Sequence, residues 1–222
     1  MIRVVSWNIK KSRPRLLTLT ADLSAIDLLF LQENTKDLHS TREFDSSWTI
    51  YSPDNNLYHR HRACIAASSL ATTSLDLHQK YPAEFKGNRD IIVVHAKAPN
   101  IHLLCVYNDA RDESLTVLST FLENNPNIAN NCLMVGDFNA HHPRWEPSNP
   151  KRINRLGRVV HEMIVVNNFH LHTPPDFPSF VLPSSFSSPT TIDLVFSHMS
   201  QNTESWKHCS TKVPTTDRTH LP

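Results

Sequence analysis

Short apolar runs that end in or carry a polar side chain recur along this chain of 222 residues. The runs are partly β-branched, which is typical of buried strands. Six segments share the construction, and they end at or carry Asn8, Glu33, Tyr107, Asp137, Asp193 and His220. Since open α/β sheets place ligands just beyond the carboxyl ends of their strands, the repetition predicts polar groups gathered at one sheet edge.

Strand patterns alternate with helical ones along the sequence. The predicted strands are 2–9, 26–32, 48–51, 63–68, 90–96, 101–107, 132–138, 191–197 and 206–213. Apolar residues at three-to-four spacing predict helices at 13–24, 112–124 and 154–167. Interleaved strands and helices favour the α/β class. Because no repeat or linker divides the chain, we expect residues 1–222 to form a single domain.

The stretch from Gly136 to Trp145 is the most informative part of the sequence. Asp137 and Asn139 follow the apolar run 132–135, and their spacing would put both side chains on one face if strand geometry continued. A carboxylate can take a proton or hold a metal, and an amide can orient a phosphate or a water. The pairing therefore favours phosphodiester hydrolysis, although Asp and Asn are also common in turns.

The order of the motifs resembles that of the endonuclease/exonuclease/phosphatase superfamily. The matching segments are Trp-Asn-Ile (7–9), Leu-Gln-Glu (31–33), Val-Tyr-Asn (106–108), Gly-Asp-Phe-Asn (136–139), Thr-Ile-Asp-Leu (191–194) and His-Leu-Pro (220–222). Two longer stretches, 137–145 and 154–158, are similar to the apurinic-type endonuclease domain of non-LTR retrotransposons. The resemblance covers residues 2–222 and implies a four-layered α/β sandwich, with two packed mixed sheets flanked by helices.

Glu33 and Asn8 are the metal ligands that this resemblance implies. Glu33 follows an apolar run, where a charge must be paired, metal-bound or exposed. Mg²⁺ or Mn²⁺ would suit one or two carboxylates plus waters and substrate oxygens. The alternative is a solvent-facing glutamate at a strand end. Apurinic endonucleases often carry a carboxylate two positions after that asparagine, but Lys10 stands there in this chain.

The resemblance also assigns roles in catalysis. Asp137 and Asn139 would position and deprotonate the attacking water and hold the scissile phosphate. Asp193 would orient His220, whose imidazole then faces the charge developing on phosphorus; a buried aspartate needs such a partner. Tyr107, together with Asn108, would contact a phosphate oxygen, and its alternative is an aromatic core residue.

Other potential metal ligands fit zinc poorly. His141 and His142 are adjacent, so they would point to opposite sides of an extended strand, and we expect both to pack or to flank a DNA groove. The four cysteines are widely spaced and form no Cys-x-x-Cys pair. Buried reduced thiols are therefore expected rather than a zinc site or disulfides, which indicates an intracellular protein.

Net charge gives little sign of a nucleic-acid partner, because it is only +1. Basic residues nevertheless cluster at 10–15, 60–62 and 151–158, and the first and third clusters follow proposed catalytic strands. They could contact a phosphate backbone or form a solvated helix face. No segment is apolar enough to span a membrane. The resemblance implies DNA as partner and the nucleus as location.

The chain departs from the family pattern at its C-terminus. The last motif usually reads Ser-Asp-His, whereas Arg218 and Thr219 precede His220. The chain stops at Pro222, where the family continues into a further strand, so we expect a truncated C-terminal strand. The resemblance implies an endonuclease that nicks one DNA strand for target-primed reverse transcription. A complete element would also carry a reverse transcriptase, which this chain lacks.

Two other functions remain open. The first is an inactive, truncated remnant that at most binds nucleic acid, since Thr219 replaces the last-motif aspartate. The second is a repair-type abasic-site endonuclease or a phosphatase of the same superfamily.

Overall fold

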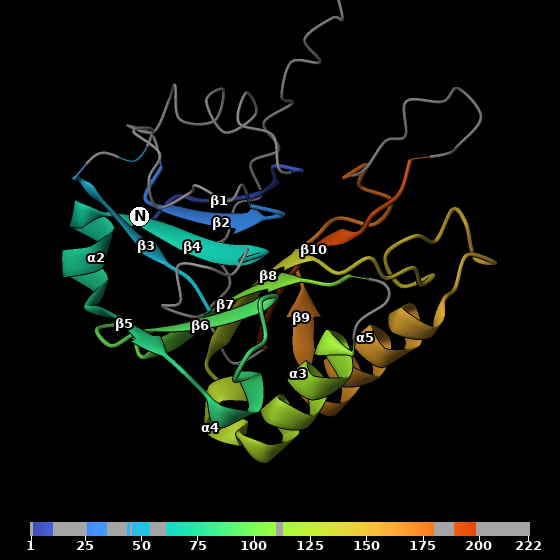
Figure 1. The fold of residues 1–222 in the computed structure, drawn as a ribbon. Helices are drawn as coiled ribbons and strands as arrows, with labels where there is room; N and C mark the ends of the chain where they lie inside the picture. Colours follow the sequence, from blue (N-terminus) through green and yellow to red (C-terminus); the bar gives the residue numbers. More distant parts are fainter. Residues whose placement is uncertain are drawn as a thin grey trace, which may run out of the picture.

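The protein consists of two mixed β-sheets with helices packed against them (Figure 1). The computed structural model describes residues 2–10, 26–34, 44, 46–53, 61–109, 113–179 and 189–198. The predicted α/β class is therefore confirmed. The helix predicted at 13–24 and the strand predicted at 206–213 lie outside the described residues.

The first part of the chain forms a four-stranded sheet. Its strands are β1 (Val4–Asn8), β2 (Leu28–Gln32), β3 (Trp48–Tyr51) and β4 (Ala63–Ser68), in the order β1-β2-β4-β3. β1 and β2 are parallel, with Asn8 opposite Gln32, and β4 is antiparallel to both of its neighbours. Because β2 and β4 are almost entirely buried, they are continuous apolar runs rather than alternating ones.

The rest of the described chain forms a six-stranded sheet. Its strands are β5 (Leu77–Lys80), β6 (Ile91–Ala96), β7 (Ile101–Tyr107), β8 (Cys132–Asp137), β9 (Phe169–Leu171) and β10 (Asp193–His198), in the order β5-β6-β7-β8-β10-β9. β7 and β8 are parallel, with Tyr107 opposite Asp137. β10 is antiparallel to β8, so Asp193 at its start also lies opposite Asp137. Three polar residues therefore meet at one edge of this sheet.

Helices cover the face of the six-stranded sheet that lies away from the other sheet (Figure 1). These elements are the 3-10 turn η3 (Ala83–Phe85), α3 (Ser114–Asn124), α4 (Pro126–Ala129) and α5 (Arg155–Val166). A further helix, α2 (Ser69–Leu75), instead contributes Ala71 and Leu75 to the core between the sheets. In α5, Leu156, Val160, Met163 and Ile164 are buried at helical spacing. The helix begins after Asn154, whose side chain accepts the Gly157 N–H at 2.6 Å.

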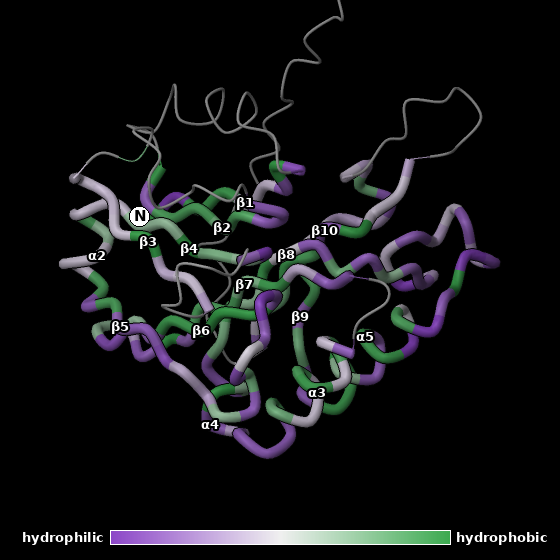
Figure 2. The backbone as a smooth tube through the Cα atoms, in the orientation of Figure 1, coloured by the Kyte–Doolittle hydropathy of each residue, from purple (hydrophilic) through white to green (hydrophobic). Residues whose placement is uncertain are grey.

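Apolar side chains pack on both faces of the six-stranded sheet. Much of the backbone of its central strands carries the hydrophobic colour in Figure 2. Phe30, Ile65 and Cys105 belong to the core between the sheets. Met134 and Phe121 belong to the core under the helices. Full burial of such a side chain stabilises the fold by about 1.5–3 kcal/mol. The two sheets pack against each other through the first core, and helices cover the outer face of the six-stranded sheet.

The structure also contains short elements that the sequence pattern did not predict, namely α2, α4, β5 and β9. The sequence of α2, SLATTSL, is rich in Ser and Thr, which are poor helix formers, so tertiary packing decides its conformation. β9 has three residues, too few for a period to be recognised.

Cys64, Cys105 and Cys132 are buried free thiols, as expected, and Cys209 lies outside the described residues. Burial raises the pKa of Cys105 and of Cys132 to about 12, so both thiols stay protonated at neutral pH. None of the helices in the described part of the chain has the length and apolar character needed to cross a bilayer.

Gly136 lets β8 pack closely against β7, and we expect Gly136→Ala to destabilise the protein by about 1–3 kcal/mol. A methyl group there would lie 1.8 Å from the Val106 carbonyl oxygen, so the backbone must shift. Urea unfolding would measure the loss. Gly87→Asn is the matched control, because Gly87 has φ +76° with nothing within 4 Å, and asparagine tolerates that conformation. Equal stabilities of the Gly136 variant and the wild type would contradict the prediction.

Candidate active site

The two sheets meet through polar side chains at the ends of their strands. Asn8, the last residue of β1, donates from Nδ2 to Oδ2 of Asp137 at 2.8 Å. Tyr107, the last residue of β7, donates from its hydroxyl to Oε1 of Glu33 at 3.0 Å. Because each hydrogen bond joins one sheet to the other, the strand ends of both sheets form one site.

Turns at the strand ends set the positions of Glu33 and Asn8. Glu33 has φ 50°, a left-handed conformation that is unfavourable for glutamate, and its N–H donates to the Arg62 carbonyl oxygen at 2.7 Å. Lys10 also has φ 50°, and its N–H donates to Oδ1 of Asn8 at 2.9 Å. Such backbone strain clusters at functional sites, so it supports a functional role for this edge.

A turn, not a continued strand, brings Asp137 and Asn139 together. β8 ends at Asp137, and Asn139 has φ 47°, so the strand geometry assumed for the Asp-x-Asn spacing stops between them. Instead, Oδ1 of Asp137 accepts the Asn139 N–H at 3.0 Å, in the manner of an Asx turn. The Asn139 side chain donates to the Asn108 carbonyl oxygen at 2.6 Å.

Asn108 ties the end of β7 to the end of β8. Its N–H donates to the Asp137 carbonyl oxygen and its Nδ2 to the Phe138 carbonyl oxygen, both at 2.8 Å. Its Oδ1 is buried and has no hydrogen-bond partner in the described part of the chain. An orphaned buried acceptor is costly, so it points to a donor that arrives with a ligand or water.

The carboxyl groups at this edge are difficult to ionise together. Burial raises the pKa of Asp137 to about 6; hydrogen bonds from Asn8 and Asn139 lower it, and the charge of Glu33 raises it further. Burial and then the charge of Asp137 raise the pKa of Asp193 to about 8. Burial and the nearby Glu33 carboxylate also raise the pKa of Tyr107. A cluster of this kind favours the uptake of a proton or a cation.

The donors at this edge are of the kind that hard divalent cations prefer. Glu33 and Asp137 supply carboxylate oxygens, and Asn8 supplies an amide oxygen. No group of three or more His, Cys, Asp or Glu side chains suited to a metal ion occurs among the described residues. The two carboxylates and the amide fit a cation such as Mg²⁺, which keeps several waters when it is bound.

The structure brings six of the eight sequence-predicted site residues to this edge through hydrogen bonds: Asn8, Glu33, Tyr107, Asn108, Asp137 and Asn139. Asp193 lies there as well, opposite Asp137. His220, the predicted partner of Asp193, lies outside the described residues, as do Arg218 and Thr219.

Arg62 belongs to the site but was not predicted. Its Nε and Nη2 pair with both carboxylate oxygens of buried Asp90 at 2.5 and 2.6 Å, and its Nη1 contacts Asp109 at 2.7 Å. The guanidinium lies 5.4 Å from the centre of the Tyr107 ring. The basic cluster at 60–62 suggested only that Arg62 contacts phosphate or lies on a solvated helix face. Its pairing with Asp90 and Asp109 joins residues that are far apart in the sequence, so no local pattern indicates it.

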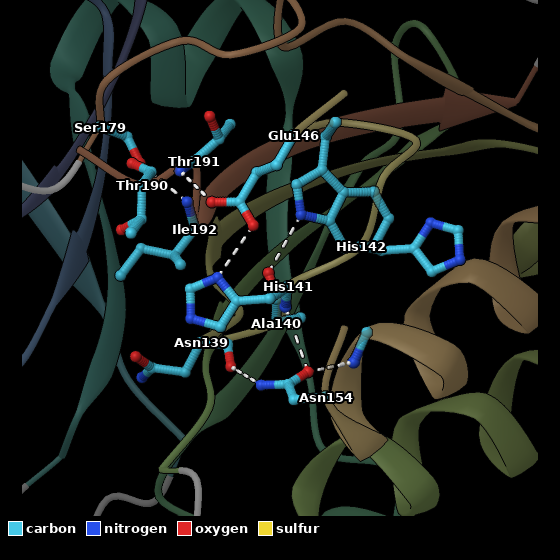
Figure 3. A network of polar contacts seen from close by, with 12 residues as sticks. Asn139, Ala140, His141, His142, Glu146, Asn154, Ser179, Thr190, Thr191 and Ile192 are labelled. Carbon is cyan, nitrogen blue, oxygen red and sulfur yellow. Dashed lines mark hydrogen bonds and ion pairs between the residues drawn. The ribbon is translucent and has the colours of Figure 1, made fainter. Parts of the chain in front are cut away.

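A second polar network lies beside the first and was also missed (Figure 3). Its centre is Glu146, which is 3% exposed. Glu146 contacts Nδ1 of His141 at 2.9 Å and accepts the Thr191 N–H at 3.0 Å. His142 instead stacks on Trp145 and His161, with ring centres 5.2 and 4.3 Å apart. The packing role expected for His142 is therefore present.

Comparisons with known proteins agree with this arrangement. Residues 101–222 match a family model described as endonuclease-reverse transcriptase. No curated protein matches the sequence significantly.

Solved structures show the same fold. The endonuclease domain of TRAS1, a telomere-specific non-LTR retrotransposon, has a TM-score of 0.68 at 18% identity, covering 90% of this chain and 86% of that one. AP endonuclease LMAP from Leishmania major has a TM-score of 0.62 at 14% identity, covering 88% and 79%. D. rerio TDP2, crystallised with a single-strand DNA product, has a TM-score of 0.52 at 11% identity, covering 89% and 84%.

Proposed function

Because this chain belongs to the endonuclease-reverse transcriptase family, within the endonuclease/exonuclease/phosphatase superfamily, we propose that it is a divalent-metal-dependent DNA endonuclease. Its substrate would be a phosphodiester bond in one strand of duplex DNA. The 3′-hydroxyl left by that nick would prime reverse transcription. The protein would therefore act in the nucleus, together with a reverse transcriptase.

The environment of Asp137 is the observation that supports the proposal most directly. The residue is 5% exposed and lies where the two sheets meet, and its carboxylate accepts N–H groups of Asn8 and Asn139. With a pKa raised to about 6, it is suited to take a proton from water near neutral pH. We assign Asp137 as the general base, with Asn139 positioning the water and the scissile phosphate.

The neighbouring groups would hold the phosphate as charge develops on it. Tyr107 carries a hydroxyl that already serves as a hydrogen-bond donor, and its raised pKa keeps it protonated. Asn108 would contact the phosphate from the buried end of β7. Asp193, opposite the base, would hold the His220 imidazole in place by a hydrogen bond.

Glu33 and Asn8 would hold Mg²⁺ or Mn²⁺ in this site. Glu33 supplies a carboxylate oxygen, and Asn8 supplies an amide oxygen that accepts the Lys10 N–H; oxygen ligands of this kind are those that hard cations require. When bound, the cation would polarise the phosphate and offset its negative charge. Before substrate binds, the Tyr107 hydroxyl would keep that carboxylate oriented toward the site, and its single O–H would then turn to the phosphate.

Three substrates incubated with the protein and Mg²⁺ would test the proposal. Supercoiled plasmid that becomes nicked would support it, whereas cleavage of only an abasic duplex would indicate a repair-type enzyme. Release of phosphate from a phosphomonoester alone would indicate a phosphatase. No cleavage of any substrate would refute the proposal. If Thr219→Asp then restored nicking, the chain would be an inactive remnant of such an enzyme.

We expect Glu33→Gln to raise the Mg²⁺ concentration for half-maximal nicking by at least about 10-fold. The amide keeps the shape of the side chain but cannot supply the charge that binds a hard cation. Titration of nicking with Mg²⁺ would measure the change, and Mg²⁺-induced shifts of the thermal midpoint would report binding without catalysis. Glu162→Gln is the matched control, because Glu162 is exposed on α5. An unchanged Mg²⁺ requirement would exclude Glu33 as a ligand.

A further inference from the structure

Glu146 is a buried carboxylate that the proposed chemistry does not use. Only 3% of its surface is exposed, and a buried charge is costly unless both oxygens are satisfied. One oxygen accepts the Thr191 N–H at 3.0 Å, and the other contacts Nδ1 of His141 at 2.9 Å. Both oxygens therefore have partners, each from a different segment of the chain (Figure 3).

Each of these partners lies two residues from a proposed catalytic residue. Thr191 precedes Asp193 at the start of β10, and His141 follows Asn139 in the loop after β8. Figure 3 shows the Glu146 carboxylate between Thr191 and the His141 ring. Glu146 consequently links the two segments that carry Asn139 and Asp193.

Each of the two linked segments also forms hydrogen bonds with a residue elsewhere in the chain. Asn154 accepts the His141 N–H at 3.1 Å and donates to the Asn139 carbonyl oxygen at 3.2 Å, which ties the loop to the start of α5. The Ser179 hydroxyl accepts the N–H groups of Ile192 and Asp193 at 2.9 and 3.0 Å. The Phe138 N–H also donates to the Ile192 carbonyl oxygen at 2.9 Å, and Glu146 adds a side-chain connection between the two segments.

We propose that Glu146 is a positioning residue, which sets the geometry of Asn139 relative to Asp193 through His141 and the Thr191 N–H. The inference rests on the proposed function, since it concerns the reacting groups of that site. Small displacements of reacting groups are costly, and a shift of about 1 Å can lower a rate by about 10²-fold. The loss should appear in kcat rather than in KM, because Glu146 is buried and would act through His141 and Thr191 rather than by contacting the substrate.

Four variants test the proposal. Glu146→Ala removes both contacts, so we expect kcat for nicking to fall by about 10²-fold with KM nearly unchanged. Glu146→Gln keeps an acceptor for Thr191 and a donor for His141, so kcat should recover to within about 5-fold of the wild type. His141→Ala, at a partly exposed position, should lower kcat by about 10-fold. Glu162→Ala is the matched control and should leave kcat unchanged.

Amide hydrogen exchange provides a readout that does not depend on activity. In Glu146→Ala the Thr191 amide should exchange at least about 10-fold faster, whereas the Val135 amide in the middle of β8 should not change. If Glu146→Ala does not fold, Glu146→Gln and His141→Ala decide the question. Wild-type kcat in folded Glu146→Ala or His141→Ala would overturn the proposal, as would unchanged exchange at Thr191. A wild-type protein without nuclease activity would refute the proposed function alone, since exchange would still show whether Glu146 fixes the start of β10.

Discussion

Replacement of Asp137 by asparagine is expected to lower the rate of DNA nicking by about 10²–10⁴-fold, the usual contribution of a general base. An asparagine oxygen can still accept the Asn139 N–H, which the wild-type carboxylate accepts at 3.0 Å. The lost contact with Asn8 would cost about 1 kcal/mol, and removal of a buried charge would offset part of this loss. The variant should therefore fold but be nearly inactive.

Single-turnover cleavage of a nicking substrate at saturating Mg²⁺ would measure this loss. Circular dichroism and urea unfolding would establish that the variant is folded. Glu162→Gln, an exposed carboxylate of α5 treated in the same way, should retain wild-type activity. Nicking by Asp137→Asn within about 3-fold of the wild type would exclude Asp137 as the base.

Asp193→Asn is expected to become progressively more stable than the wild type as the pH rises. Burial and the charge of Asp137 raise the pKa of Asp193 to about 8 in the folded protein, above the ordinary value of an unfolded aspartate. The folded state therefore binds this proton more tightly. The stabilisation is complete below the unfolded pKa and is lost as the pH rises through the folded pKa. The total pH-dependent change that Asp193 makes to the free energy of unfolding is on the order of 5 kcal/mol, and the Asp193→Asn substitution removes it.

Unfolding free energies without divalent cations, measured between pH 6.5 and 9, would test this expectation. Below that window, His102 and His172 act in the opposite direction, because burial lowers the pKa of each to about 4. Within the window, the stability difference between Asp193→Asn and the wild type should grow by on the order of 2 kcal/mol. A difference independent of pH would show that Asp193 is already ionised at neutral pH.

The parts of this site that could be predicted are those that depend on local sequence patterns. Apolar runs such as 28–32 and 132–137 predict buried strands, and the polar residue at each end is visible beside them. Parallel pairing then brings Asn8 beside Gln32 and Tyr107 beside Asp137, so convergence at one edge follows from sheet geometry. The resemblance to a known superfamily added the roles of these residues.

The parts that could not be predicted depend on contacts between distant residues. Arg62 pairs with Asp90 and Asp109, 28 and 47 positions away, and no local pattern encodes such pairs. Glu146 and Thr191 are 45 positions apart in the sequence, so their contact could not be predicted from a local pattern either. The Asx turn at Asp137 was left open as an alternative, because the Asp-x-Asn spacing occurs in strands and in turns alike.

The division of the site between two sheets has a consequence for how the protein is made. Every described strand of the first sheet precedes residue 69, and every described strand of the second follows residue 76. A ribosome therefore completes Asn8 and Glu33 long before Asp193 emerges. Unfinished chains and proteolytic fragments that lack either half hold only part of the candidate site. Under the proposed function, such products would be unable to nick DNA.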